Sequence, residues 1–401
     1  MPTQDLVKAV QEIKSMTADS LLMCAPRRHS LGPLVILRQQ MLGALYDPIR
    51  QACLDGLSSE QCMEQMLENP MFSRKMAEQG LHENMFVFNY VIMRHVTTNA
   101  PIFTVSPALD VMLEDTKING NIPVRFFAPP AATCFIEFDP PENRQVSTHR
   151  SFAEGRYRIC EGAFVQENVF PSLPKLSRMA TEMLELDPNL PTRKLNISFS
   201  ASPVDKFGKP AGRSMAGEIG DDTVDFLSLF LQDPEEDVTS MLERHIRYYL
   251  LRNEIEASMS ALDFDAFTVN FRRNLIHLTK IFFYLNVEKR QQVKINAASD
   301  LERSIKAVAP KKQRKLIQQR SRVYDRIVVG PKEYVPVSQR LEAGDLPSGT
   351  RRPHYRRGYF GIRYVGSGQA KHAELVRVKE ALINEQLIKD ADIKPKQYEV
   401  R

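Results

Sequence analysis

This 401-residue chain has no tryptophan and few cysteines. The cysteines are Cys24, Cys53, Cys62, Cys134 and Cys160, an odd set in which no pair follows the Cys-x-x-Cys spacing of a zinc site. Neither a disulfide framework nor a structural zinc site is expected from this usage. A chain that carries free thiols fits a reducing compartment, so the sequence predicts a cytoplasmic protein.

Long apolar runs and metal-ligand clusters are also missing. No apolar run approaches the roughly 20 residues that a membrane-spanning helix needs, and Asp5 and Glu12 interrupt the N-terminal region where a signal peptide would lie. None of the eight histidines stands at a metal-ligand spacing from a cysteine or another histidine. We therefore expect no membrane contact, no metal and no cofactor. His245 and His277 fall on expected helices among apolar residues, which is typical of core histidines.

The motifs of common catalytic sites are incomplete. The stretch around Ser214 resembles a nucleophile elbow but has Ala216 where the second glycine should stand, which favours an ordinary loop serine. The stretch 366–371 has two glycines and a lysine without the spacing of a P-loop. A backbone cradle for a single phosphate stays open as an alternative there. A non-enzymatic role is favoured on this basis.

The charge is distributed unevenly along the chain. Residues 301–401 carry 23 Lys and Arg against 11 Asp and Glu, a net charge of +12, whereas the first 300 residues carry 31 against 38, a net charge of −7. Apolar residues make up 43% of the chain, enough for a sizeable core. An acidic body with a basic C-terminal quarter predicts a partner that is a polyanion, such as nucleic acid.

Periodicity and turn signals predict an α+β fold. We expect an N-terminal helical region, a central and mostly antiparallel sheet with packed helices, and a basic C-terminal element. The corresponding boundaries are 1–100 for the helical region, 101–300 for the α+β core, 301–350 for a basic linker with a hairpin, and 351–401 for the C-terminal element.

Individual elements follow from local patterns. Ser58 and Gln61 predict a capping box at a helix start, and Ser106 followed by Pro107 predicts another helix start. Runs rich in β-branched and aromatic residues predict strands. The expected helices are 6–17, 33–52, one opened by Ser58, 107–114, 223–231, 235–258 and one ending near Leu285; the expected strands are 124–127, 133–138, 156–165, 195–200 and a hairpin over 325–337.

Two charge runs in the body have alternative interpretations. An acidic run includes Asp221, Asp222, Asp225, Asp233, Glu235, Glu236 and Asp237. These carboxylates suit helix N-termini, where they complement the helix dipole, or they form a wall that receives a basic peptide. The basic run 311–315 is either a solvated face or an RNA contact.

The stretch 352–371 alternates cations, aromatics and glycines. Arg offers a planar fork of donors for phosphate oxygens, and Tyr or Phe offers a face on which a base can stack. His354 either contacts phosphate or a base, or serves as the general acid or base of a metal-independent ribonuclease. The predicted RNA-binding residues are Arg351, Arg352, His354, Tyr355, Arg356, Arg357, Tyr359, Arg363 and Lys371.

The same stretch resembles a type V-A anti-CRISPR family of phage- and plasmid-borne proteins. That family carries Arg-Pro-His-x-Arg-Arg-Gly, seven residues, and then Gly-x-Gly-Gln-Ala-Lys. The first block is matched from Arg352 to Gly358 and the second from Gly366 to Lys371, with the same spacing. The family continues its first block with His-Trp, whereas this chain has Tyr359 and Phe360, so stacking survives but a role of that histidine would be lost.

The resemblance implies a protein that suppresses production of a CRISPR effector in a bacterial host cell. It would recognise the nascent effector polypeptide during translation and lower its mRNA, with the ribosome or the mRNA as the RNA partner. Two alternatives stay open, namely a metal-independent ribonuclease and a general RNA-binding protein. The oligomeric state and the target are not indicated by the sequence.

Overall fold

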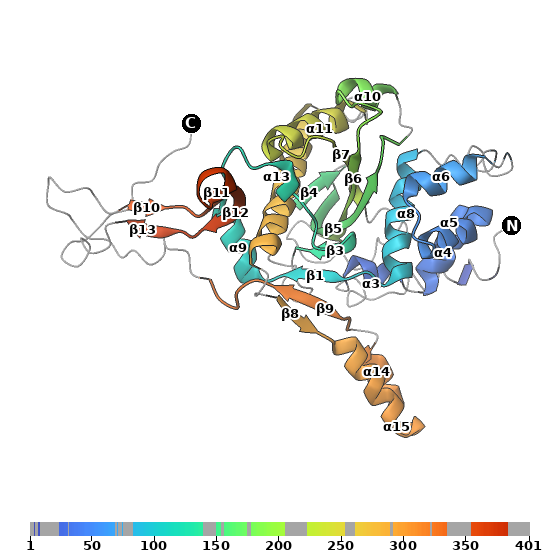
Figure 1. Ribbon diagram of the computed structural model, residues 1–401. Helices are drawn as coiled ribbons and strands as arrows, with labels where there is room; N and C mark the ends of the chain where they lie inside the picture. The colour runs from blue at the N-terminus through green and yellow to red at the C-terminus, as the bar shows by residue number, and fades with distance from the viewer. Residues whose placement is uncertain are drawn as a thin grey trace, which may run out of the picture.

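The computed structural model describes most of the chain in segments, and Figure 1 shows their arrangement. The described residues are 4, 7–8, 24–30, 32–68, 70, 74, 83–138, 150–153, 156–174, 178–204, 223–252, 261–288, 292–320, 323–334 and 354–383. The predicted helix over 6–17 and the Ser214 stretch lie largely or wholly outside these residues.

A mixed sheet forms the centre of the described fold. Its strand order is β7-β6-β5-β3-β1-β9-β8, and β4 pairs with β5 beside this path. The strand β1 is parallel to both β3 and β9, while the other described pairs are antiparallel. The α+β prediction with a mostly antiparallel sheet is confirmed. The bounds are β1 (Ile102–Val105), β3 (Thr133–Glu137), β4 (Arg150–Ala153), β5 (Arg156–Phe170), β6 (Thr192–Val204), β7 (Thr223–Leu231), β8 (Gln292–Ile295) and β9 (Arg326–Val329).

One face of the sheet is apolar and is covered by three helices (Figure 1). This face is apolar because side chains alternate between the two faces along β6, and Leu195, Ile197 and Phe199 all point to this side and join the main core. On that side the aromatic ring of Phe271 stacks on Tyr249 at 4.6 Å. The helices are α9 (Pro107–Asp115), α11 (Val238–Arg252) and α13 (Ala261–Val287).

The opposite face combines polar side chains with the buried rings of Phe135 and Phe164, and it is covered by the N-terminal helices. The alternate residues of β6 are Lys194, Asn196, Ser198 and Ser200, and all four are buried. The predicted helical region is confirmed in its described part, and Ser58 and Gln61 form the predicted capping box. Its helices are α3 (Ala25–His29), α4 (Gly32–Leu42), the 3-10 turn η1 (Gly43–Leu45), α5 (Tyr46–Leu54), α6 (Ser59–Leu67) and α8 (Glu83–Thr98).

Two buried ion pairs join the N-terminal helices to the sheet. Arg28 on α3 donates to Glu161 on β5, with one contact at 2.8 Å, and both side chains are almost fully buried. Lys194 on β6 donates to Glu60 on α6 at 2.5 Å. The pKa of Glu60 is lowered because the favourable contact with Lys194 outweighs the opposing effect of burial. This interface is therefore fixed by charge pairing as well as by apolar packing.

Buried histidines predict acid sensitivity of the fold. Burial lowers the pKa of His95 and of His245 to about 4, and it lowers the pKa of His29 well below the usual value. The unfolded chain takes up these protons near pH 6.5 and the folded chain does not, so stability is full above pH 6.5 and falls as the pH drops toward 4. We expect a loss of roughly 2 kcal/mol for each of His95 and His245 between pH 7 and pH 5, with a further loss from His29 in the same direction. Urea unfolding at both pH values measures this loss, and equal unfolding free energies would contradict it.

Three local predictions were wrong. Residues 223–231 form the strand β7 rather than a helix, and 124–127 contain the 3-10 turn η2 (Val124–Phe126) rather than a strand. In its described part, residues 325–334, the expected hairpin over 325–337 supplies the strand β9 alone. Both partners of β9 come from elsewhere in the chain: β1 lies more than 200 residues upstream, and β8 precedes the helices α14 and α15. The helix expected over 235–258 begins at Val238, so Glu235 and Glu236 precede it.

The remaining elements extend from the body (Figure 1). Two helices leave the β8–β9 edge as a projection, a small sheet of β2, β11 and β12 lies beside α9 and α13, and the β10–β13 ribbon extends away from the body beyond it. Within the described residues, no helix is long and apolar enough to cross a membrane. The bounds are α10 (Arg178–Met183), α14 (Ala297–Ala307), α15 (Pro310–Arg320), β2 (Lys117–Ile118), β10 (His354–Arg356), β11 (Tyr359–Val365), β12 (His372–Val378), β13 (Ala381–Ile383) and the 3-10 turn η6 (Gly368–Ala370).

Candidate nucleic-acid interface

The two blocks of the C-terminal motif occupy different parts of one β structure. The first block contains β10, which pairs with β13, and it ends at Gly358 just before β11. The second block forms the turn between β11 and β12. The hairpin β11–β12 thus places the two blocks at its opposite ends.

One face of this hairpin is fixed to the body. Phe360 is fully buried, and its ring lies 5.6 Å from that of Phe283 on α13. Ile362 and Leu375 are paired across the hairpin and pack against the same core. On the outer edge of β11, the Lys117 N–H donates to the Gly358 carbonyl at 3.0 Å, so β2 adds a short parallel strand.

Two glycines are required by the geometry of the motif. Gly366 has φ of +101°, and a Cβ there would lie 2.5 Å from the carbonyl oxygen of Ala370. A Cβ on Gly358 would lie 3.2 Å from a carboxylate oxygen of Glu380, which itself pairs with Arg377. These glycines shape the turn and the base of the hairpin. The proposed phosphate cradle at 366–371 stays a prediction.

Most of the predicted cations that the structure describes are exposed. The side chains of Arg356, Arg357, Arg363 and Lys371 are exposed, and none of them makes a hydrogen bond or ion pair to another described residue. Tyr359 is half-buried on the same face as Arg363, because strand residues two apart point to one side. The structure therefore brings these five predicted residues together on one hairpin and its base.

Other predicted residues are described only in part. The backbones of His354 and Tyr355 pair with Ile383 and Leu382, and their side chains lie outside the described set. Arg351 and Arg352 lie outside the described residues altogether. The alternative role of His354 in a ribonuclease stays a prediction.

Sequence reasoning missed several residues at this surface. Tyr364 is 72% exposed on the face opposite Tyr359, so the hairpin offers an aromatic ring on each side. Lys117 is exposed beside Tyr359 and comes from β2, more than 200 residues upstream. The alternation of residues 359–364 could have indicated Tyr364, but nothing in the sequence indicated Lys117.

Arg357 is electrostatically linked to the body through Lys280. Burial lowers the pKa of Lys280 on α13 to about 8, while Glu114 and Asp115 oppose that shift and Arg357 adds to it. The Lys280 ammonium donates to the Leu113 carbonyl at 2.8 Å. The base of the hairpin therefore lies against the C-terminal end of α9.

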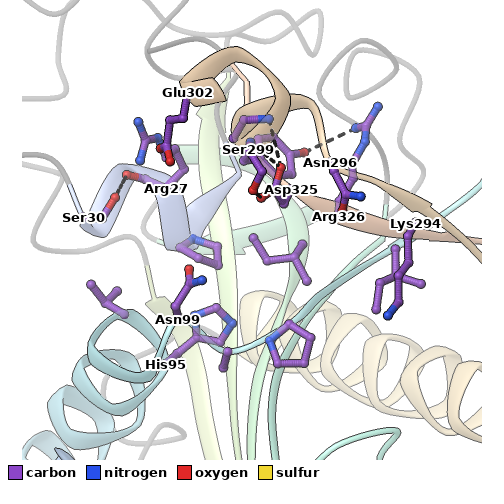
Figure 2. A pocket seen from close by; sticks show the side chains of 18 residues that line it. Arg27, Ser30, His95, Asn99, Lys294, Asn296, Ser299, Glu302, Asp325 and Arg326 are labelled. Carbon is purple, nitrogen blue, oxygen red and sulfur yellow. Dashed lines mark hydrogen bonds between the residues drawn. The ribbon is translucent and has the colours of Figure 1, made fainter. Parts of the chain in front are cut away.

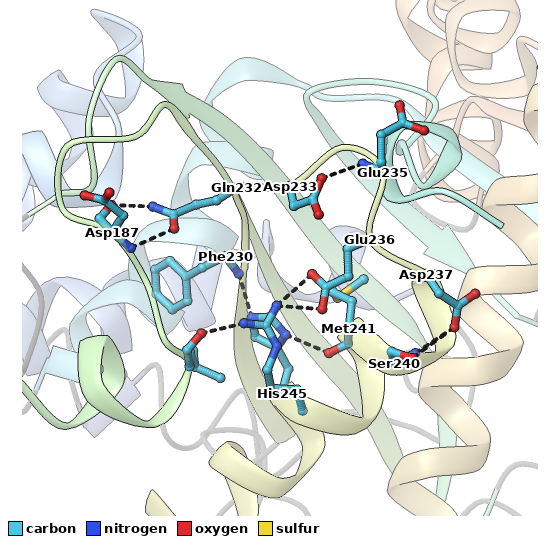
Figure 3. A network of polar contacts seen from close by, with 12 residues as sticks. Asp187, Phe230, Gln232, Asp233, Glu235, Glu236, Asp237, Ser240, Met241 and His245 are labelled. Carbon is cyan, nitrogen blue, oxygen red and sulfur yellow. Dashed lines mark hydrogen bonds and ion pairs between the residues drawn. The ribbon is translucent and has the colours of Figure 1, made fainter. Parts of the chain in front are cut away.

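Of the acidic residues predicted to bind peptide, Glu235 and Glu236 precede α11 and have internal partners (Figure 3). Glu236 accepts two hydrogen bonds from Arg244, at 2.7 and 2.8 Å, and Glu235 forms an ion pair with Arg125. Burial raises the pKa of Glu236, and the nearby Asp233 and Asp237 add to that shift. Asp225 is a strand residue of β7 whose side chain is not described, and Asp221 and Asp222 lie outside the described residues.

A cavity of about 410 Å³ adjoins this network. Its charged lining residues are Glu185, Asp187, Asp233, Glu236 and Arg244, so carboxylates predominate. Asp237 instead caps α11, accepting from the Ser240 N–H at 3.0 Å. The helix-dipole interpretation thus holds for Asp237, and the peptide-binding wall stays a prediction for the others.

A second cavity of about 350 Å³ lies where α3, α8, β9 and the start of α14 meet (Figure 2). Arg27, Lys294 and Arg326 bring positive charge to it, and Glu302 and Asp325 bring negative charge. Behind its wall, Tyr324 and Thr104 both donate to the fully buried Glu137 at 2.7 Å. No local sequence pattern indicated this cavity, because its walls come from four distant segments.

Comparison with known proteins identifies the class of protein as anti-CRISPR. The chain belongs to the anti-CRISPR type V subtype A2 family, whose AcrVA2-like model matches residues 103–370. The match runs from β1 to the turn of the C-terminal hairpin and leaves out the N-terminal helices. This finding confirms the family resemblance seen in the sequence.

A solved structure gives a weaker likeness. The crystal structure of AcrVA2 is similar with a TM-score of 0.38 and 10% sequence identity, covering 87% of this chain and 99% of that chain. These values are too low to transfer the role of any residue. No curated protein matches this chain.

Proposed function

We propose that this protein suppresses production of a CRISPR effector in the bacterial cytoplasm. It recognises the nascent effector polypeptide at the ribosome and lowers the effector mRNA, and its C-terminal hairpin contacts ribosomal RNA or mRNA. The observation that carries the proposal is a group of exposed, unpaired cations beside tyrosines on that hairpin, within a chain of an anti-CRISPR family.

The chemistry of the hairpin suits single-stranded RNA. Arg356, Arg357 and Arg363 have guanidinium groups that no other described residue engages, so their donors are available for phosphate oxygens. The exposed ring of Tyr364 offers a face for stacking. Docking through Phe360 fixes the backbone of β11 that carries Arg363 and Tyr364, so RNA binding has to order their side chains but not this backbone.

The acidic cavity beside Glu236 is the surface that we assign to the effector peptide. Four of its charged lining residues are carboxylates, which favour a basic segment. Arg244 and Arg125 already pair with Glu236 and Glu235, so an incoming lysine or arginine would compete with these internal cations. A short basic segment is therefore expected to bind weakly on its own and more tightly when the RNA contact holds it nearby.

Sedimentation of a tagged copy tests the proposal. Extracts of cells that produce a candidate CRISPR effector are run through a sucrose gradient with intact polysomes or after puromycin release of nascent chains. We expect the protein to comigrate with polysomes and to leave them after puromycin. A protein that stays at the top of both gradients would refute recognition at the ribosome. A protein that stays on ribosomes after puromycin would bind RNA without reading the nascent chain.

A further inference from the structure

The helices α14 and α15, residues 297–320, form a projection that we call the α14–α15 arm (Figure 1). The N-terminal end of α14, where the arm joins the body, is fixed, because Asp325 accepts hydrogen bonds from the N–H groups of Ala298 at 2.9 Å and Ser299 at 3.1 Å and so caps the helix. Its bend is fixed as well, since the Gln313 amide donates to the carbonyls of Ile305 and Val308 at 3.1 Å. The arm is therefore a folded element that holds its side chains in defined directions.

Four neighbouring cations of α15 lie on one half of the helix. The side chains of Lys311, Lys312, Arg314 and Lys315 are all exposed, and none of them makes a hydrogen bond or ion pair to a described residue. At about 100° per residue they fall within an arc of roughly 160°. Gln313 and Leu316 lie outside that arc and are half-buried. The arm thus presents a cationic face that points away from α14.

The clustering of like charges on this face destabilises α15 when no partner is bound. The sequence of α15 contains no acidic residue, so its cations repel one another at the i, i+3 and i, i+4 spacings. The nearby Asp300 on α14 is already paired with Arg303. A polyanion that supplies evenly spaced negative charges would relieve the repulsion and release bound counterions.

The amino-acid composition of the arm indicates which kind of polyanion it would bind. Neither α14 nor α15 contains an aromatic residue, so the arm cannot stack bases in the way that the C-terminal hairpin can. Base-paired RNA exposes rows of phosphates and hides its base faces, and proteins recognise it by shape and backbone. We propose that the α14–α15 arm binds the phosphate backbone of base-paired RNA without reading its sequence. This surface is separate from the C-terminal hairpin (Figure 1), so the proposal does not rest on the translational role.

Titration of the full-length protein with three probes tests the arm. The probes are a fluorescent 20-base-pair RNA duplex, a single-stranded oligouridine and poly-glutamate. The variant is Lys311→Gln with Lys312→Gln and Lys315→Gln, since glutamine keeps the helix propensity and removes the charge. The matched control is Arg50→Gln with Arg247→Gln and Lys332→Gln, three exposed cations on other surfaces.

The arm variant is expected to bind the duplex about tenfold more weakly, and the slope of log affinity against log salt should fall by up to about 0.9 for each lost contact. The control should bind like the unmodified protein, and oligouridine binding should change little in either variant. Circular dichroism checks that the arm stays helical. Equal duplex binding by the arm variant and the unmodified protein would overturn the proposal. Loss of binding to poly-glutamate with unchanged duplex binding would also overturn it and would assign the face to an acidic protein.

Discussion

Replacing Arg356 and Arg357 with glutamate is expected to abolish suppression of the CRISPR effector while leaving the protein folded. Both side chains are exposed and unpaired among the described residues, so their loss should change the free energy of unfolding by less than about 0.5 kcal/mol. Hydrogen bonds to charged groups contribute about 1.5–3 kcal/mol each, which predicts RNA binding weaker by on the order of a hundredfold. Effector protein and mRNA levels in cells, with binding to single-stranded RNA in vitro, measure the two effects.

A matched control makes the result specific. Arg50→Glu with Arg247→Glu changes the net charge by the same amount on exposed sites of α5 and α11. This control should suppress like the unmodified protein. Suppression that survives the Arg356 and Arg357 substitutions would remove the C-terminal hairpin from the mechanism. Loss of suppression in both double variants would point to overall charge instead of a defined surface.

Replacing Glu161 with methionine is expected to destabilise the fold by about 3–5 kcal/mol, because it leaves the Arg28 charge buried without its carboxylate. Arg28 is only 2% exposed and Glu161 is fully buried, so water cannot replace the lost contact without opening the interface. Urea unfolding measures the loss. An unfolding free energy within about 1 kcal/mol of the unmodified protein would show that Arg28 is satisfied by other groups.

The double replacement separates charge from packing. Arg28→Met combined with Glu161→Met removes both charges and keeps a similar volume, and such replacements of buried pairs are often neutral or stabilising by about 1–4 kcal/mol. We therefore expect the double variant to be more stable than the Glu161 variant. A double variant as unstable as the single one would mean that the pair also orders neighbouring groups, such as the buried His29 beside Arg38.

Local signals predicted the elements that local chemistry determines. The capping box at Ser58 and the N-cap at Ser106 were predicted correctly, because the residues that make each contact lie three apart in the chain. The strand β7 was taken for a helix, since Leu227 and Leu229 face one core while Phe230 on the alternate side is also buried. A strand that is buried on both faces shows no alternation of apolar and polar residues, so its sequence pattern does not distinguish it from a helix.

The sequence predicted which residue types the candidate site contains, but not how those residues are arranged in space. The exposed cations of 356–371 follow from the sequence, but the anchoring of Phe360 on Phe283 joins residues 77 positions apart and has no local signal. The carboxylates of Glu235 and Glu236 suggested a free acidic wall, whereas Arg125 and Arg244 pair with them in the fold. Those arginines lie in different elements, so pairing of this kind follows only from the three-dimensional structure.

The central position of β1 also determines the order in which the chain can fold. The neighbours of β1 are β3, about 30 residues on, and β9, which ends at Val329. Ser106 stabilises the pairing of β1 with β9, since its N–H donates to the Val329 carbonyl at 2.9 Å and its hydroxyl donates to the Pro331 carbonyl. As the protein is synthesised, β1 therefore keeps one unpaired edge until more than 320 residues have been made, and such long-range pairing is slow. A chain shortened before β9 would leave this edge open and should aggregate rather than retain partial function.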